Sequence, residues 1–391
     1  MAALPPFLQP DVIARATVEA GLGPRALAVL HALARRIAAD DALLEVCADA
    51  HAAVFDSERP FAEAVARADA ALGTDAELLH ALYLLDTLRL VHERQRARGV
   101  DAAISHAINE RHGVAWLRGA RDAEGVPRLR DWLPSWFRLV GSGELYRLGR
   151  LEFAPERWHA PYRVYVHETR GEVVALADSG LGFSAHGERA LDGATVSFES
   201  LLVEQMDGVS GTPISPRGRA LARRVHLPAA EWRLGLVRGD WILDMHVPAE
   251  GELSLAAVKD SYARALELFA ERYPARTFSA FVCDSWLFSS ELERLIEPPS
   301  NILTWQREGY LLPGEGGHDW FLKFVFGSAE LDLARAPRDT RLRRALLDAL
   351  ARGERLRDGV YFLLASDLHR FGSAPYRDAA VRALSESMDG A

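Results

Sequence analysis

A strand, a helix and a second strand follow one another between residues 241 and 288, and this pattern constrains the fold more than any other feature of the sequence. The run WILDMHVP (Trp241–Pro248) reads as a buried strand, and FSAFVCDSWLF (Phe278–Phe288) is apolar enough to lie in the interior of a sheet. The helix between them has Ser254 as its N-cap and Pro274 as its stop. A strand–helix–strand unit of this length predicts two neighbouring parallel strands.

The first third of the chain is predicted to be all-α. The proline-free stretch Ala26–Phe55 is rich in alanine, leucine and arginine, which are strong helix formers. Gly73 is expected to end the next helix as a C-cap. Thr74 with Glu77 three residues on reads as a capping box that opens a long helix, and a further helix is expected over Asp101–Leu117.

The rest of the chain mixes strands and helices. Strands are predicted where the sequence alternates or runs apolar, at Glu144–Phe153, Arg163–Ala177, Asn301–Leu312 and Asp319–Gly327. A last substantial helix is expected over Thr340–Arg352. The predicted fold class is therefore α+β or α/β, with an all-α N-terminal domain over 1–135 and a mixed α/β domain over 136–391.

Composition and charge argue against several classes of function and location. The formal net charge is −9, from 46 basic and 55 acidic residues, which argues against a nucleic-acid binder. No apolar run approaches the roughly 18–20 residues that span a bilayer, and the first residues lack the basic region of a secretory signal. We therefore expect a cytoplasmic protein without a membrane span. Only two of the basic residues are lysine, which is typical of a GC-rich bacterial genome.

Five segments carry a family resemblance. They are, in order along the chain, LYRLGRLEF, GDWILDMHVPAEG, FVCDSWLFSSELERLIEPPSNILTWQ, PRDTRLRRALLDAL and FLLASDLHRFG. In these segments the chain resembles a bacterial acyltransferase-like family in which a helical N-terminal acyltransferase domain precedes a GNAT-like C-terminal domain. The resemblance covers most of the chain from about Leu145 onward. It implies a mixed sheet that opens between its fourth and fifth strands. In such folds the pantetheine arm of an acyl-CoA lies in the opening and the pyrophosphate meets the next helix N-terminus.

The resemblance assigns Trp241–Pro248 to the fourth strand and the helix from Ser254 to the pyrophosphate. The residues implied in donor binding are Val247, Ala249, Gly251, Leu253, Ser254 and Lys259. Free backbone N–H groups and the helix dipole at such an end favour phosphate. The loop nevertheless departs from the usual Arg/Gln-x-x-Gly-x-Gly/Ala pattern, because it reads PAEGELS with acids at Glu250 and Glu252. An acyl-carrier protein as donor, the loss of cofactor binding, and a plain strand-to-helix turn all stay open.

Candidate catalytic residues lie near the ends of the two strands. Direct acyl transfer needs a base for the attacking amine, and His246 has a near-neutral pKa, although it also fits a hydrogen-bonded structural histidine. Asp284 and Ser285 are the other candidates, and the family often has a histidine where this chain has Asp284. We expect His246 and Asp284 to border one polar pocket, because a polar group buried alone is costly. Cys283 is either a covalent nucleophile paired with His246 or a small buried hydrophobe.

The function expected from these residues is GNAT-like N-acyltransfer. The acyl group would move directly from acyl-CoA, or from a phosphopantetheine-linked donor such as an acyl-carrier protein, to a small-molecule or peptide amine, and no metal would take part. Two alternatives remain open at this point. One is a catalytically inactive GNAT-like fold that binds a ligand or a protein partner. The other is a cysteine-dependent acyl hydrolase, which depends on Cys283 alone.

Overall fold

The chain forms two compact units, Met1–Leu148 and Gly149–Ala391. The computed structural model describes residues 4–56, 60–130, 133–190, 194–316, 318–328 and 330–377. The last part of the expected mixed tail, from residue 378 onward, lies outside the described residues. Each unit is described by itself below.

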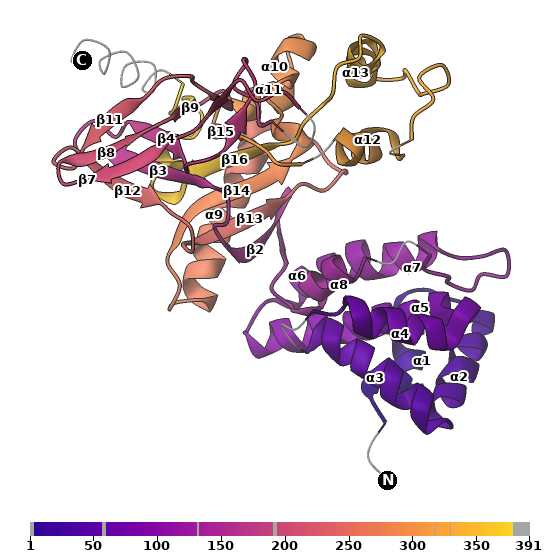
Figure 1. The fold of residues 1–391 in the computed structure, drawn as a ribbon. Coiled ribbons are helices and arrows are strands. Elements are labelled where there is room, and N and C mark those ends of the chain that lie inside the picture. The colour runs from indigo at the N-terminus through magenta and orange to yellow at the C-terminus, as the bar shows by residue number, and fades with distance from the viewer. Residues whose placement is uncertain are drawn as a thin grey trace. The chain divides into compact units, whose positions relative to one another are not determined.

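The N-terminal unit is helical, as the sequence predicts (Figure 1). Its helices are α1 (Pro10–Glu19), α2 (Pro24–Ala38), α3 (Asp41–Phe55), α4 (Ala62–Leu72), α5 (Ala76–Ala97), α6 (Ala102–Asn109), α7 (Ala115–Gly119) and α8 (Pro134–Gly141). A π-helical turn, Glu110–Val114, joins α6 to α7, and the short strand β1 (Tyr146–Leu148) ends the unit. Helix α5 is buried over most of its length and provides much of this unit's core.

Most helix ends in this unit follow the sequence. The long stretch expected from Ala26 divides after α2, where the Asp40 side chain accepts from the Leu43 N–H and caps α3. Gly73 ends α4 with a φ of 57°, as expected of a C-cap. The capping box at Thr74 was wrong, because residues 73–75 form a 3₁₀ turn and α5 begins at Ala76 without a side-chain cap.

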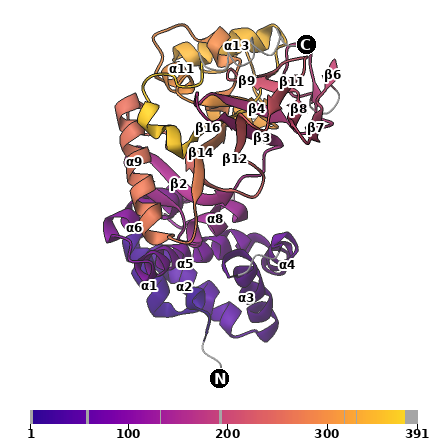
Figure 2. The same cartoon turned by 90° about the vertical axis from the view of Figure 1, so that its left-hand side faces the viewer.

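The C-terminal unit contains the predicted parallel pair (Figure 1), and the helix between the two strands, Leu255–Arg272, lies beside the sheet in Figure 2. Its first sheet runs in the order β2 (Leu151–Arg157), β13 (Trp241–His246), β14 (Phe278–Ser285), β16 (Gly359–Leu364) and β15 (Tyr310–Pro313). Only the β13–β14 pairing among these is parallel. The strand–helix–strand prediction is confirmed, and helix α9 (Leu255–Arg272) connects the two parallel strands.

A second layer of strands follows β2 in the chain. One sheet has the order β10 (Arg219–Ala220), β9 (Pro213–Ser215), β4 (Val173–Ala177), β3 (Tyr162–His167) and β12 (Trp232–Leu236). Two smaller sheets consist of β11 (Val225–Pro228), β8 (Gly208–Gly211) and β7 (Leu202–Gln205), and of β5 (Gly182–Phe183) with β6 (Phe198–Glu199). The strand region predicted over Arg163–Ala177 is confirmed, and it forms the antiparallel hairpin of β3 and β4.

Two predicted strands are helices instead. Ser300 accepts a hydrogen bond from the Leu303 N–H and caps α11 (Asn301–Gln306), so only Tyr310–Pro313 of that segment is a strand. The segment expected as Asp319–Gly327 is helix α12 (His318–Phe326), because Phe321 and Val325, four residues apart, both belong to one apolar cluster. That cluster also includes Leu346 of α13 (Arg341–Ala351), a predicted helix that Thr340 caps, whereas α10 (Leu292–Leu295) is a single short turn.

Gly359 offers a test of how β16 is held against the end of β14. A Cβ on Gly359 would lie 2.0 Å from the carbonyl oxygen of Phe288, so the backbone there leaves no room for a side chain. We predict that Gly359→Ala lowers the free energy of unfolding of the C-terminal unit by about 1–3 kcal/mol. Denaturant unfolding measures this change.

Gly119→Ala is the matched control, since a Cβ at Gly119 meets nothing within 4 Å. It should change the free energy of unfolding by less than about 0.5 kcal/mol. Equal effects of the two substitutions would contradict the close approach at Gly359.

Candidate functional site

The parallel strands β13 and β14 pair with each other over only part of their length. Their register joins Leu243 to Phe281 and ends at Asp244 and Val282. Beyond that point β13 stays paired with β2, as far as His246, and β14 stays paired with β16, as far as Ser285. The two strands therefore part at their carboxyl ends, each held by its outer neighbour. This confirms the expected divergence.

At the carboxyl ends of β13 and β14 the two faces of the sheet differ in chemistry. Phe281 packs on α9, where the ring of Tyr262 stacks on it at 4.3 Å between centroids. Side chains alternate along a strand, so Cys283 shares that apolar face. Paired residues of adjacent strands lie on the same face, and the Asp244–Val282 pairing therefore puts Asp244 and Asp284 together on the other side of the sheet.

His246 and Asp284 thus lie on one face, and Asp244 links them. The Nε2 atom of His246 lies 3.2 Å from Oδ2 of Asp244, and both side chains are half-buried. Asp244 is also one of the carboxylates that act electrostatically on Asp284. The polar pocket expected around His246 and Asp284 stays a prediction, but the three side chains form one polar group on one face.

Asp284 titrates near neutrality. Solvent reaches its side chain, yet the protein surrounds it on most sides, and this desolvation raises its pKa from 3.8 to about 7. The neighbouring carboxylates of Asp358, Asp244 and Glu315 add to the rise. Burial also raises the pKa of Asp358, to about 6. A carboxylate with a pKa near 7 can accept a proton from an amine more readily than an ordinary aspartate can.

The sequence analysis missed three of the acidic residues here. Asp244 lies two residues before His246 on the same strand, so strand alternation gave a signal for it. Glu152 is opposite His246 in the β2–β13 ladder and is 1% exposed, and only the antiparallel pairing brings the two together. Asp358 reaches Asp284 because β16 pairs with β14, which no local pattern in the sequence indicates.

Ser285 and Cys283 lie on the other face. The Ser285 hydroxyl accepts a hydrogen bond of 3.3 Å from the Leu287 N–H and so caps the 3₁₀ turn after β14. A catalytic role for Ser285 stays a prediction. Cys283 is buried, and its burial, with Asp244 and Asp284 nearby, raises the pKa of its thiol well above the usual value. Since the thiolate is the nucleophilic form, this environment disfavours covalent catalysis.

The loop from β13 to α9 contains the predicted donor-binding residues Val247, Ala249, Gly251, Leu253 and Ser254. Ser254 caps α9, because its side chain accepts a hydrogen bond of 3.3 Å from the Ala257 N–H. Arg150 compensates part of the acidity of this loop, since its Nε atom donates to the carbonyl oxygen of Glu252 at 3.2 Å. A Cβ on Gly251, whose φ is 90°, would lie 3.5 Å from the Arg150 side chain.

The ammonium group of Lys259 forms its hydrogen bond outside the loop between β13 and α9. Its ammonium donates a hydrogen bond of 3.2 Å to the carbonyl oxygen of Phe371, a residue near the end of the described chain. Phosphate binding by Lys259 therefore stays a prediction that requires this contact to be released.

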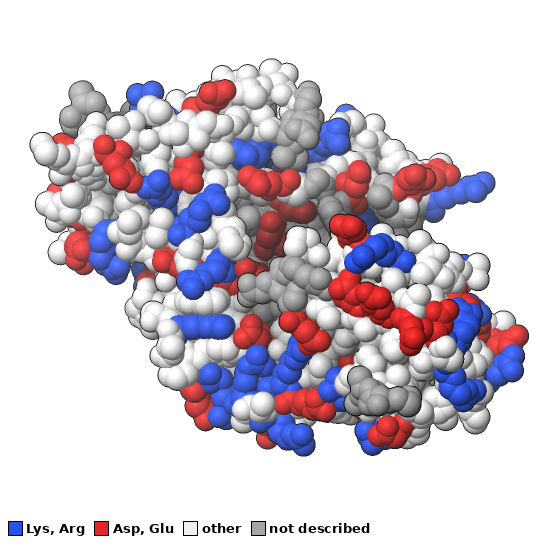
Figure 3. Space-filling model, turned by 60° about the horizontal axis from the view of Figure 1, so that its bottom comes forward, with Lys and Arg blue, Asp and Glu red and all other residues white. Residues whose placement is uncertain are grey.

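Over the ranges given above, no group of three or more His, Cys, Asp or Glu side chains is placed to hold a metal ion. Across the same part of the chain, no helix has the length and apolar character needed to cross a bilayer. Acidic and basic side chains are interspersed on the face that Figure 3 shows.

A mixed sheet whose parallel inner strands part at their carboxyl ends, with a capped helix connecting the first to the second, defines the class of GNAT-like acyltransferase folds. Comparison with family models agrees. Residues 145–363 match the GNAT-like C-terminal domain, and residues 13–140 match the N-acyltransferase N-terminal domain. The chain therefore belongs to the acyltransferase family that joins these two domains. No curated protein matches the chain significantly.

Solved structures of acyltransferases share the fold. One, an acyltransferase mutant in complex with octanoyl-CoA, has a TM-score of 0.55 and 17% identity, and the alignment covers 90% of this chain and 88% of that one. Another, in complex with decanoyl-CoA and teicoplanin, has a TM-score of 0.55 and 18% identity, with coverage of 89% and 86%. A third, in complex with decanoyl-CoA, has a TM-score of 0.51 and 17% identity, with coverage of 90% and 98%.

The raised pKa of Asp284 means that the charged form of this side chain destabilises the folded protein, so removing the charge should stabilise it in a pH-dependent way. Because the folded-state pKa of about 7 exceeds the ordinary 3.8, the stabilisation is complete below pH 4 and is lost as pH rises through 7. Asp284→Asn removes the charge that forms there. Its effect should therefore grow across that pH window, so that it raises the melting temperature to a limited extent at pH 5 and more at pH 8.

Asp332→Asn serves as the matched control, because Asp332 is exposed and pairs with Arg335 on the surface. Thermal melts of both variants and the wild type across pH 5–8 give the comparison. A melting-temperature difference for Asp284→Asn that does not grow with pH would contradict the assignment.

Proposed function

We propose that this protein is an N-acyltransferase that moves an acyl group from acyl-CoA directly to an amine. The observation that carries the proposal is the parting of β13 and β14 after Asp244 and Val282, beside a helix whose capped N-terminus follows the first strand. Family membership and the acyl-CoA ligands of the structural neighbours support it.

The donor would lie along the parted strand ends. Its pantetheine arm would hydrogen-bond to backbone groups that the β13–β14 ladder no longer uses, as a strand does at a sheet edge. Its pyrophosphate would meet the first-turn N–H groups of α9, where the helix dipole favours negative charge. Arg150, bonded to the carbonyl of Glu252, would offset the acids of the loop.

The chemistry would use the polar face. The amine nitrogen attacks the thioester carbon, so that a C–N bond forms and the C–S bond breaks. Asp284, as a carboxylate above its pKa of about 7, takes the proton from the amine. His246, held beside Asp244, would orient the amine or protonate the leaving thiolate. Ser285 keeps only the role of a cap in this scheme.

The acceptor class is proposed as a peptide-like or small-molecule amine. One structural neighbour is described in complex with teicoplanin, and this supports a peptide-like acceptor for a related fold. An acyl-carrier protein would present the same phosphopantetheine thioester, so the rates of thiol release from acyl-CoA and from an acyl-carrier protein distinguish the two donors.

A ligand-binding protein without activity is the second candidate. Glu250 and Glu252 in the donor loop favour it, since carboxylates repel a pyrophosphate. The two functions differ in one measurable respect, because only the enzyme releases thiol from acyl-CoA when an amine is present.

Substitutions on the polar face should reduce turnover without unfolding the protein. We predict that His246→Ala and Asp284→Asn each lower acyl transfer from decanoyl-CoA roughly 10²–10⁴-fold, the usual contribution of general acid–base catalysis. Thiol release in the presence of an amine panel measures the rate, and thermal melts check the fold. Wild-type rates in a stable His246→Ala protein would reject its role. Binding of acyl-CoA without any thiol release would favour the second candidate.

Cys283→Ala tests whether acyl transfer is direct or passes through a covalent acyl-enzyme on this thiol. Since the thiol is buried on the α9 face and kept protonated, we predict turnover within about threefold of the wild type, well below the loss expected for a catalytic group. The same thiol-release assay applies, with Cys47→Ala as the matched control because Cys47 is also buried, in the N-terminal unit. A nearly complete loss of turnover in Cys283→Ala alone would instead establish a covalent acyl-enzyme.

A further inference from the structure

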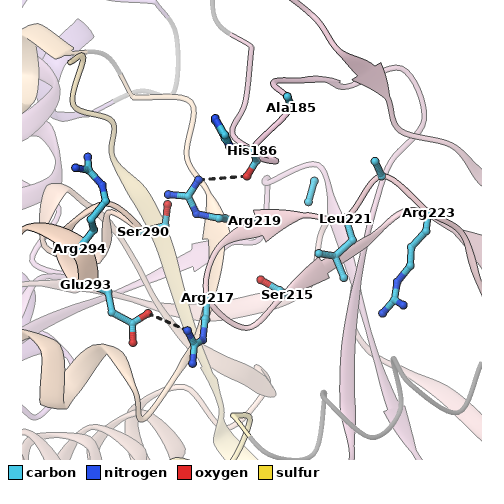
Figure 4. A pocket seen from close by; sticks show the side chains of 12 residues that line it. Ala185, His186, Ser215, Arg217, Arg219, Leu221, Arg223, Ser290, Glu293 and Arg294 are labelled. Atoms are coloured by element: carbon cyan, nitrogen blue, oxygen red, sulfur yellow. Dashed lines mark hydrogen bonds and ion pairs between the residues drawn. The ribbon is translucent and has the colours of Figure 1, made fainter. Parts of the chain in front are cut away.

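A pocket rich in arginine lies within the C-terminal unit, away from the donor loop. Its volume is about 790 Å³, and its lining includes the β9–β10 hairpin, the turn around His186 and helix α10 (Figure 4). Four of the lining residues are arginines, Arg217, Arg219, Arg223 and Arg294, and one lining residue is acidic, Glu293. No residue of the segment from Val247 to Lys259 takes part in it.

The single acid of the lining is surrounded by more positive charge than it can neutralise. A carboxylate oxygen of Glu293 lies 3.9 Å from Nη1 of Arg217. The same carboxylate lies 3.7 Å from Nη2 of Arg307 and 3.8 Å from Nη1 of Arg377. These separations exceed those of a hydrogen bond. One negative charge is thus shared among three guanidinium groups, and the carboxylate is in none of these three contacts close enough for a hydrogen bond.

Arg377 shows that this positive charge is incompletely satisfied. Its side chain is 13% exposed, and its Nε and Nη1 atoms are buried without a hydrogen-bond partner among the described residues. Burial lowers the pKa of Arg377, and the nearby Arg217 and Arg307 lower it further. An added anion is expected to stabilise a buried guanidinium whose N–H groups lack partners.

Two of the remaining arginines of the pocket are held in place by hydrogen bonds, mostly to residues outside the lining. Arg219 donates to Glu188 at 2.8 Å and to the carbonyl of His186 at 3.2 Å. Arg294 is paired with Glu354 on its outer side. Arg223 Nε has no hydrogen-bond partner within the described part of the chain. Figure 4 shows Arg219, Arg294 and Ser290 gathered on one side of the pocket.

We propose that this pocket binds the phosphate monoester group of a ligand. Guanidinium groups present paired N–H donors that match a phosphate. Glu188 and Glu354 each pair with one of the four lining arginines, but Arg217 and Arg223 have only the distant Glu293 in the lining, and a dianion suits this excess of positive charge better than a monocarboxylate does. Arg217 and Arg294 are the exposed arginines that a ligand meets first. The site is separate from the pyrophosphate position proposed at α9, and its binding of phosphate does not require acyl transfer.

Isothermal titration with inorganic phosphate at low salt tests the proposal. We expect saturable binding by the wild type and at least about a tenfold loss of affinity in the double variant Arg217→Gln/Arg294→Gln, since charge-assisted hydrogen bonds are the strong ones. Arg335→Gln is the matched control, because Arg335 is a highly exposed arginine outside the pocket. Acetate at the same concentrations should bind much more weakly.

Three results would overturn the proposal: no saturable phosphate binding by the wild type, equal affinity in the double variant and the control, or acetate binding as tightly as phosphate. Competition then identifies the source of the phosphate. Displacement by CoA but not by dephospho-CoA would assign the pocket to the donor's 3′-phosphate, and displacement by neither would assign it to another phosphorylated molecule. Thiol release from acyl-CoA is measured separately, so a failure of this site is distinguishable from a failure of the proposed function.

Discussion

The end of the β13–β14 ladder at Asp244 and Val282 is the constraint on which the rest of the site depends. Two parallel strands that part inside a sheet each need an outer neighbour to hold their ends, while the backbone groups that face the gap are left for another partner. Here β2 and β16 provide these partners to the last residues of β13 and β14. The separation is therefore fixed by four strands and exists before any ligand binds.

Aromatic packing decides which side of the separated strands becomes polar. Tyr262 of α9 stacks on Phe281 and also meets Phe153 of β2, which anchors the apolar face of the sheet. Side-chain alternation then leaves Asp244, His246 and Asp284 on the opposite face. Desolvation, together with the neighbouring carboxylates, raises the pKa of Asp284 toward neutrality, and this makes it the best-suited base among the candidates.

The sequence predicted the parts of this arrangement that local patterns encode. Strand runs and the cap at Ser254 gave the β13–α9–β14 unit, and alternation separated Cys283 from Asp284. The misassigned α12 illustrates a short apolar segment that periodicity alone could not assign. Asp358 and Glu152 became visible only through strand pairing, since β16 and β2 are distant in sequence from β14 and β13. Likewise, the arginines around Glu293 come from several separate segments.

Hydrogen exchange with and without decanoyl-CoA tests the central claim most directly. If the donor binds along the parted strands, amides of Met245–Ala257 and of Asp284–Leu287 should become protected, while the amides of β3 and β4 should not change. Protection confined to other segments, or no protection at saturating donor, would contradict the account.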